Sequence, residues 1–378
     1  MLFCSKNGDK IYYTALLSAK FKRRITMNYT NGYDPFDNGY TFYDDIVVKD
    51  AKRTNSKISL GMVLFIVGYY AFVVALQLVI TSIFGIRALE DLLANQYFST
   101  FIGFFCMYLI GLPILWLVIK KLPKRMIVKK EKLSIQEFLA LIPIGQFLMY
   151  AGAMIGLYAD NFLSILLGKE VSNPVVDMSE SMPIWVFIIV SVIIGPLLEE
   201  FIFRGLLFDR LSVYGNVYAT IFTAVIFGAF HGNLQQFYYA LLLGLVLGYI
   251  RAKTGSFKIP FILHAIMNFI SGVIPILLDS HMAGFEKALE AYFIGDGDVF
   301  IENISSFMLY GSYSMLQTTL MIAGGIMFFR TLLKKKLDFK NDPEIEIPKR
   351  RLASTIFSNT GVISLIVVSF LLIVLNYL

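Results

Sequence analysis

Three short patterns of polar residues lie within long apolar stretches of this chain, and they hold the residue types of a hydrolytic site. The patterns are Glu199-Glu200-x-x-x-Arg204, Phe227-x-x-x-His231 and His264-x-x-x-Asn268. A single Asp, Lys or Arg at the centre of a membrane helix costs about 2.5–3.5 kcal/mol, so ionisable groups at that depth need polar partners or water. A carboxylate can serve as a base, an imidazole can assist it, and an amide can donate a hydrogen bond to a developing oxyanion. We therefore expect a hydrolase whose active site lies within the membrane.

The two adjacent glutamates are expected to have different roles. On a helix, Glu199 and Glu200 point about 100° apart, whereas Glu200 and Arg204 are one turn apart and can form an ion pair. This leaves Glu199 on a different face, where it is placed to act as the general base. The alternative is a structural ion network that contains both glutamates and Arg204.

Two histidines extend the candidate site. The chain has 3 His, of which His231 and His264 lie in apolar stretches, and His264 shares a helix face with Asn268. A lone histidine in a membrane helix is more often a packing residue than a catalyst. Two near a glutamate pair favour a shared site, while His281 is expected in an outer loop. A zinc site formed by Glu199, His231 and His264 is the alternative, although the chain has no HExxH pattern.

The composition is that of a membrane protein. The chain has 378 residues, of which 57% are hydrophobic and 16% are charged, whereas a soluble domain is about 25% charged. The net charge of +6 would suggest nucleic acid as a partner of a soluble protein. Here the Lys and Arg residues cluster between apolar runs, which indicates topology and the lipid bilayer as partner, with no nucleic acid. The 2 Cys exclude a disulfide scaffold.

The elements that must position these residues are membrane helices, which need about 20 apolar residues each. The apolar runs lie near 58–84, 99–119, 136–157, 183–207, 216–231, 236–251, 259–278, 309–329 and 357–378. We predict an all-α polytopic membrane protein with about nine transmembrane helices, eight to ten being the range, and a helical-bundle catalytic core. The fifth and sixth runs are short and meet at Gly232-Asn233, which predicts a hairpin.

The loop charges predict the orientation. Segments 120–132 and 330–351 are densely basic, whereas segments 158–182 and 279–307 are acidic. By the positive-inside rule the basic segments are cytoplasmic, which puts the N-terminus inside and the C-terminus outside. We expect an integral protein of the bacterial plasma membrane, with an active site that opens to the cytoplasm.

The chain divides into four parts by composition. Residues 1–56 are polar and predict a cytoplasmic, mostly disordered tail, in which Met27 is an alternative start. Residues 57–180 contain the N-terminal transmembrane helices, and 181–280 the catalytic helical core. Residues 281–378 contain a C-terminal loop and the last transmembrane helices.

Small residues and one proline indicate where helices approach closely or bend. Gly195-Pro196 is expected to loosen the helix about one turn before the glutamates. Small residues one turn apart allow close contact between membrane helices. Such pairs occur at Gly152-x-x-x-Gly156 and Gly244-x-x-x-Gly248.

Residues 182–275 resemble the CPBP family of intramembrane glutamic endopeptidases. The resemblance lies in the order of the motifs EExxxR, FxxxH and HxxxN, and in the sequence that connects the second motif to the third. This family includes the eukaryotic prenyl-protein (CAAX) protease and bacterial Abi-type bacteriocin-immunity proteins. The resemblance implies that Glu199 activates the attacking water with help from His231, and that His264 and Asn268 form the oxyanion hole. It also implies metal-independent chemistry without a cofactor. The residues that would brace the first glutamate are Glu200 and Arg204.

The resemblance leaves the biological role open. The leading hypothesis is an endopeptidase acting on a peptide or membrane protein, and the alternative is a non-catalytic bacteriocin-immunity or regulatory protein. A proton-coupled transporter is a third class, disfavoured because no inverted repeat is recognisable. The Ile-, Lys- and Phe-rich composition indicates a low-GC bacterium, so a peptide pheromone or bacteriocin precursor is expected rather than a prenylated protein. The sequence does not indicate an oligomeric state.

Overall fold

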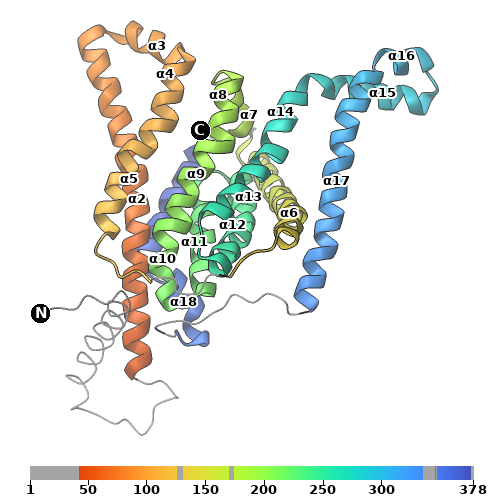
Figure 1. The fold of residues 1–378 in the computed structure, drawn as a ribbon. Coiled ribbons are helices and arrows are strands. Elements are labelled where there is room, and N and C mark those ends of the chain that lie inside the picture. Colours follow the sequence, from red (N-terminus) through yellow and green to blue (C-terminus); the bar gives the residue numbers. More distant parts are fainter. Residues whose placement is uncertain (1–41, 126–130, 170–173, 335–344, 346, 376–378) are drawn as a thin grey trace, which may run out of the picture.

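The fold is described by a computed structural model (Figure 1). The described residues are 42–125, 131–169, 174–334, 345 and 347–375. Every regular element in these ranges is a helix, which confirms the all-α prediction. The first 41 residues of the predicted tail lie outside the described ranges.

The helices follow one another in three groups. The N-terminal group contains α2 (Phe42–Phe84), α3 (Ile86–Ala94), α4 (Gln96–Thr100), η1 (Phe101–Phe105), α5 (Cys106–Ile119) and α6 (Ile135–Leu167). The central group contains α7 (Pro174–Glu180), α8 (Ile184–Ile189), η2 (Val190–Ile194), α9 (Gly195–Glu200), η3 (Phe201–Leu207), α10 (Phe208–Leu211), η4 (Ser212–Tyr214), α11 (Asn216–Phe230), α12 (Leu234–Thr254), α13 (Lys258–Asn268), η5 (Phe269–Val273) and α14 (Ile274–Leu278). The C-terminal group contains η6 (Asp279–His281), α15 (Met282–Ile294), α16 (Gly297–Glu302), α17 (Ile304–Leu333), η7 (Lys349–Arg351), α18 (Leu352–Phe357) and α19 (Thr360–Leu375).

Six continuous helical segments of the described chain are long and apolar enough to cross a membrane, fewer than the nine runs predicted. They are Asp45–Phe84, Gln96–Ile119, Ile135–Leu167, Ile184–Tyr214, Lys258–Ile294 and Ile304–Leu333. The remaining three runs are also helical, but α11 and α19 are shorter and α12 has polar residues at both ends. A hydropathy run does not distinguish a helix buried in the bundle from one that spans the membrane by itself.

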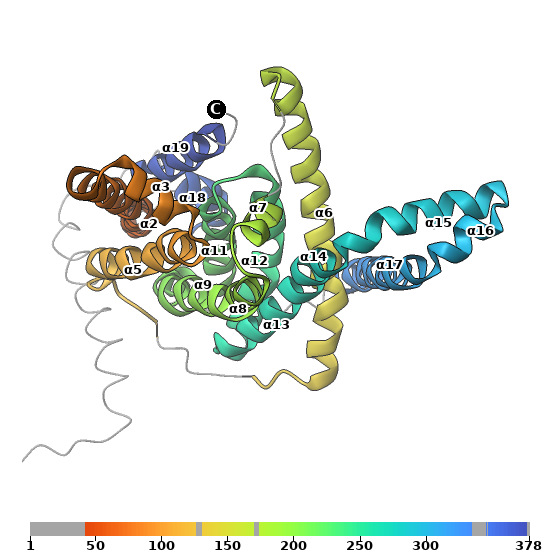
Figure 2. The same cartoon turned by 90° about the horizontal axis from the view of Figure 1, so that it is seen from above.

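The central hairpin organises the bundle. Seen from above, α11 and α12 lie in the middle, with α2, α5 and α19 on one side and α6 and α17 on the other (Figure 2). The N-terminal end of α2 and the C-terminal ends of α5 and α17 lie on the same side of the bundle (Figure 1). Helices α3, α4, α7, α15 and α16 lie on the opposite side. The basic segments 120–132 and 330–351 therefore follow helices that end on the same side.

The tail prediction is wrong for residues 42–56, which form the first turns of α2. Val47 and Ala51, one turn apart, are fully buried in the main core. The Asn55 amide donates a hydrogen bond to the Thr355 carbonyl oxygen at 2.9 Å. The polar composition of this stretch conceals an amphipathic helix, because its charged residues occupy the faces that do not enter the core.

The predicted outer segments are also more ordered than loops. Helix α6 extends to Leu167, so it covers the start of segment 158–182. Segment 279–307 holds η6, α15, α16 and the first turn of α17. Acidic residues on exposed helix faces explain why this composition resembles a loop.

The hairpin predicted at Gly232-Asn233 is confirmed. Gly232 has a φ of +65°, a conformation that favours glycine, and it separates α11 from α12. The side chain of Asn233 caps α12 by accepting a hydrogen bond from the Gln236 N–H at 2.8 Å. The turn is therefore short, and the two helices pack directly against each other.

Both predicted pairs of small residues lie at helix crossings on α12. A methyl group added at Gly152 would come within 2.5 Å of the Tyr239 Cα, and one added at Gly248 within 2.7 Å of the Thr220 side chain. Helix α6 thus packs closely on one side of α12 and α11 on another, as the glycine spacing predicted.

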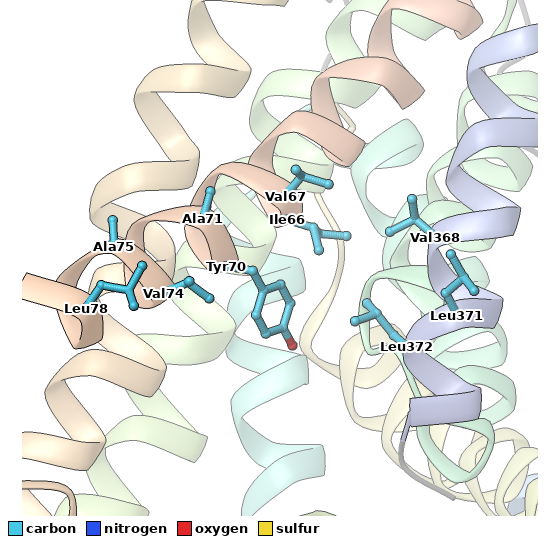
Figure 3. A pocket seen from close by; sticks show the side chains of 10 residues that line it. All are labelled: Ile66, Val67, Tyr70, Ala71, Val74, Ala75, Leu78, Val368, Leu371 and Leu372. Atoms are coloured by element: carbon cyan, nitrogen blue, oxygen red, sulfur yellow. The ribbon is translucent and has the colours of Figure 1, made fainter. Parts of the chain in front are cut away.

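Helix α19 closes the hairpin from the other side. The Ser369 hydroxyl donates to the Ala229 carbonyl oxygen at 2.9 Å, and Leu372 lies 3.2 Å from where a Cβ would project at Gly232. A groove of about 560 Å³ lies between α19 and α2, lined almost entirely by apolar side chains and the Tyr70 ring (Figure 3). None of the candidate catalytic residues lines this groove.

Candidate active site

The predicted glutamates lie on α9, a short helix between two wider π-helical segments, η2 and η3. The Gly195 N–H bonds to the Val190 carbonyl oxygen, five residues back, so the helix widens just before the glutamates. Wide turns of this kind are frequent at functional sites. The loosening predicted from Gly195-Pro196 is therefore confirmed.

The side chain of Asn268 forms a hydrogen bond with a backbone carbonyl oxygen of this wide turn. In the five-residue register, the Ser191 carbonyl oxygen would accept from residue 196, but Pro196 has no N–H. The Asn268 amide supplies the missing donor at 2.8 Å. The contact fixes the C-terminal end of α13 against η2, in a setting where a buried backbone oxygen needs a partner.

The predicted ion pair between Glu200 and Arg204 is confirmed. Glu200 Oε1 accepts from Arg204 Nη1 at 2.8 Å, and both side chains are completely buried. The Arg204 Nη2 group also donates to the Gly244 carbonyl oxygen on α12, at 3.1 Å. Glu200 and Arg204 therefore connect α9 to the hairpin and have no surface open to a substrate.

His264 lies between the two glutamates. Its Nδ1 is 3.1 Å from Glu200 Oε1, and its Nε2 is 3.6 Å from Glu199 Oε2. A carboxylate can only accept, so these partners assign the Nδ1 hydrogen to the bond with Glu200. The Glu199 side chain is 16% exposed whereas that of Glu200 is 0% exposed, so Glu199 is the more accessible of the two glutamates.

The tautomer of His231 follows from its contact with its own helix. Its Nδ1 lies 2.8 Å from the Phe227 carbonyl oxygen, which can only accept, so Nδ1 carries the hydrogen and Nε2 is an acceptor. The Phe227 ring meets the rings of His231 and His264 edge to face, at centroid distances of 5.0 and 5.6 Å. The Arg204 guanidinium lies over the same ring at 4.7 Å. Phe227 thus contacts polar groups of all three patterns.

The sequence analysis missed two tyrosines beside Glu199. Tyr108, a buried residue of α5, forms a side-chain hydrogen bond with Glu199. Tyr239 of α12 is close enough to interact electrostatically with the same carboxylate. No local pattern could have identified them, because both lie in ordinary apolar helices and the chain has 21 Tyr.

The structure thus brings Glu199, Glu200 and His264 into one cluster, and His231 contacts the same Phe227 ring as His264. The Asn268 amide is directed to Ser191 instead of the glutamates. Among the described residues, no group of three His, Cys, Asp or Glu side chains has the arrangement of a metal site.

Comparisons with known proteins found a family model and relatives. Residues 181–270 match the family model described as type II CAAX prenyl endopeptidase Rce1-like. A putative membrane peptidase of Bacillus subtilis, YdiL, is 28% identical over 42% of this chain and 64% of its own length. The membrane-embedded CAAX protease MroQ of Staphylococcus aureus is 28% identical over 27% of this chain and 44% of its own length.

The matches span less than two thirds of the length of either relative. No solved structure matches the chain. The matched segment begins before α8 and ends within η5, so it contains all the residues of the three polar patterns. Residues 181–270 of this membrane protein are thus similar to the Rce1-like type II CAAX prenyl endopeptidases.

Proposed function

We propose that this chain is an intramembrane endopeptidase in which Glu199 activates the water that attacks a peptide bond. The observation that carries the proposal is the placement of His264 between a buried glutamate and an accessible one. Glu200 is paired with Arg204 and serves structure, which leaves Glu199 as the carboxylate that can take a proton.

Glu199 removes a proton from water as the water oxygen bonds to the carbonyl carbon. The carbonyl oxygen becomes an oxyanion, and the proton held by Glu199 passes to the departing amine nitrogen when the C–N bond breaks. The Nε2 atom of His231 accepts a hydrogen bond from the water and so assists Glu199.

His264 and Asn268 are the proposed oxyanion donors. The Nε2 atom of His264 lies 3.6 Å from Glu199 Oε2, so an N–H on this atom is placed to donate beside Glu199. The Asn268 amide has two hydrogens, and only one is needed for Ser191. The other supports the oxyanion, and removing one such donor typically costs about 10²–10³ in rate.

We also propose that the substrate is a peptide or membrane protein reached from the cytoplasm, such as a peptide pheromone or bacteriocin precursor. The basic segments 120–132 and 330–351 support this orientation, because both follow helices that end on one side of the bundle.

The deciding experiment compares peptides from cells that produce the wild-type chain with those from cells producing Glu199→Gln. Mass spectrometry of membrane and secreted peptides should find cleaved termini that depend on Glu199, while immunoblotting shows equal protein levels. The purified protein in liposomes should then cleave the corresponding synthetic peptide. Full cleavage by Glu199→Gln would refute the catalytic role. A protective phenotype that survives this substitution would favour the non-catalytic immunity role.

A further inference from the structure

A partly buried polar network joins α6 and α17 to η5, the wide turn that follows Asn268. The Gln146 side-chain amide nitrogen donates to the Ser271 hydroxyl at 2.7 Å. The Ser271 hydroxyl in turn lies 3.0 Å from Oε1, the side-chain oxygen of Gln146. Gln146 also donates to the Gln317 side chain at 2.5 Å. Gln146 is 4% exposed, and Ser271, Tyr313 and Gln317 are half-buried.

The second half of the network contacts the backbone of η5. The Tyr313 hydroxyl and the Gln317 amide donate to the Ile270 carbonyl oxygen, at 3.2 and 3.3 Å. Gln317 also donates to the Tyr313 hydroxyl at 2.5 Å. Two side chains of α17 thus converge on a single carbonyl, two residues after Asn268.

The sequence explains why this carbonyl needs outside donors. The Ile274 N–H bonds to the Phe269 carbonyl oxygen, five residues back. In that register Ile270 would accept from residue 275, but Pro275 has no N–H. The arrangement repeats that at η2, where the Asn268 amide replaces the donor that Pro196 lacks. The wide turns η2 and η5 are therefore each completed by side chains from other helices.

We propose that Gln146, Tyr313 and Gln317 are positioning residues for the reaction. They hold η5 in its wide form and thereby set the angle at which α13 presents Asn268 to the site. This inference rests on the proposed function. All three residues lie outside the segment 181–270 that matches the family model, so this chain supplies the support from its own flanking helices.

The test measures kcat, KM and Tm for Gln317→Leu in liposomes, with the synthetic peptide identified through Glu199→Gln. We expect kcat to fall about 10- to 100-fold with KM unchanged, since small misplacements of catalytic groups reduce rates on this scale. The matched control is Thr331→Ala, because among the described residues the Thr331 hydroxyl bonds within its own helix α17, to the Met327 carbonyl oxygen at 2.8 Å. The control should keep the wild-type kcat.

A double-mutant cycle with Asn268→Ala separates positioning from general stability. If Gln317 acts through Asn268, the double variant should have no lower kcat than Asn268→Ala alone. Independent, additive losses would overturn the inference, and so would a lower Tm with unchanged kcat. If Gln317→Leu does not fold, Tyr313→Phe removes a single hydroxyl, and it should lower kcat without changing KM.

A conservative pair at Ser271 provides the rescue. Ser271→Ala removes the hydroxyl that bonds to Gln146 and should lower kcat, whereas Ser271→Thr keeps it and should restore kcat. If Gln317→Leu, Tyr313→Phe and Ser271→Ala are fully active while Glu199→Gln is inactive, only this inference is refuted. Full activity in Glu199→Gln would instead refute the proposed function.

Discussion

The side-chain amide of Asn268 donates a hydrogen bond to the carbonyl oxygen of Ser191 at 2.8 Å, and the two residues are 77 positions apart in the sequence. This oxygen is available because Pro196 carries no N–H. A helix defect that would ordinarily cost stability is thereby used to orient a polar residue of the candidate site.

Replacing Pro196 should disturb Asn268 without unfolding the chain. Pro196→Ala supplies an N–H that competes with Asn268 for the Ser191 carbonyl. We expect kcat to fall at least tenfold while Tm stays constant or rises, because a proline inside a helix costs about 3 kcal/mol. Pro113→Ala, in the interior of α5, is the control and should not reduce kcat. An unchanged kcat in Pro196→Ala would show that the Asn268 contact has no part in the reaction.

Glu200 should control stability and Glu199 activity. Glu200→Gln leaves Arg204 buried without its charged partner, and breaking such a pair costs about 3–5 kcal/mol. Glu199→Gln should change Tm little, because this side chain is partly exposed. Thermal unfolding in detergent measures both. Glu137→Gln, which loses an exposed pair with Lys253, should cost about 0–1 kcal/mol and is the control. Equal losses of Tm in both glutamate variants would contradict the division of roles.

Tyr108→Phe tests the tyrosine that contacts Glu199. The phenylalanine keeps the ring contacts with Phe65 and Phe104 but lacks the hydroxyl. We expect a roughly tenfold lower kcat at constant KM and Tm, since the carboxylate loses one group that orients it. Tyr69→Phe removes a hydroxyl that bonds to the Gly103 carbonyl oxygen at 3.3 Å instead of to a glutamate, and should have wild-type kinetics. Identical kinetics for Tyr108→Phe would remove this residue from the mechanism.

Chelators should leave the activity intact. If Glu199 acts directly on water, purified protein treated with EDTA or 1,10-phenanthroline keeps its rate in the peptide assay. Loss of activity that returns stoichiometrically with zinc would instead place Glu199, His231 and His264 in a ligand shell. The control is a chelator-treated sample that mass spectrometry shows to contain no bound metal.

The cytoplasmic opening can be tested with single cysteines in a Cys-free background. Lys121 and Lys258 are exposed, so cysteines there should react with a membrane-impermeant thiol reagent only in inverted vesicles. A cysteine at Asp298, exposed at the start of α16 and on the opposite side, should react in intact cells. The reverse labelling pattern would place the site on the outer face.

The features that the sequence predicted well are local ones. The pairing of Glu200 with Arg204 follows from a one-turn separation, and the close crossing at Gly248 follows from glycine spacing. The hairpin at Gly232 follows from a glycine-asparagine turn between two apolar runs. Each depends on residues within a few positions of one another, and helix geometry fixes such relationships.

The features that the sequence did not predict depend on contacts between distant helices. Tyr108 and Gln317 are ordinary members of apolar helices until the fold brings one to Glu199 and the other to Ile270. The helix over 42–56 was missed because its stability comes from packing of Val47 and Ala51 rather than from composition. The roles of the catalytic candidates remain predictions for the experiments above.

Helix α19 has a consequence for handling the protein in the laboratory. It contains none of the candidate catalytic residues, yet Ser369 bonds to the end of α11 and Leu372 packs beneath the turn that follows His231. A shortened chain that ends before Thr360 would uncover this turn and leave the Ala229 carbonyl oxygen facing lipid. Expression trials that trim the last helix to improve yield would therefore risk producing an inert protein, with every catalytic side chain still present in its sequence.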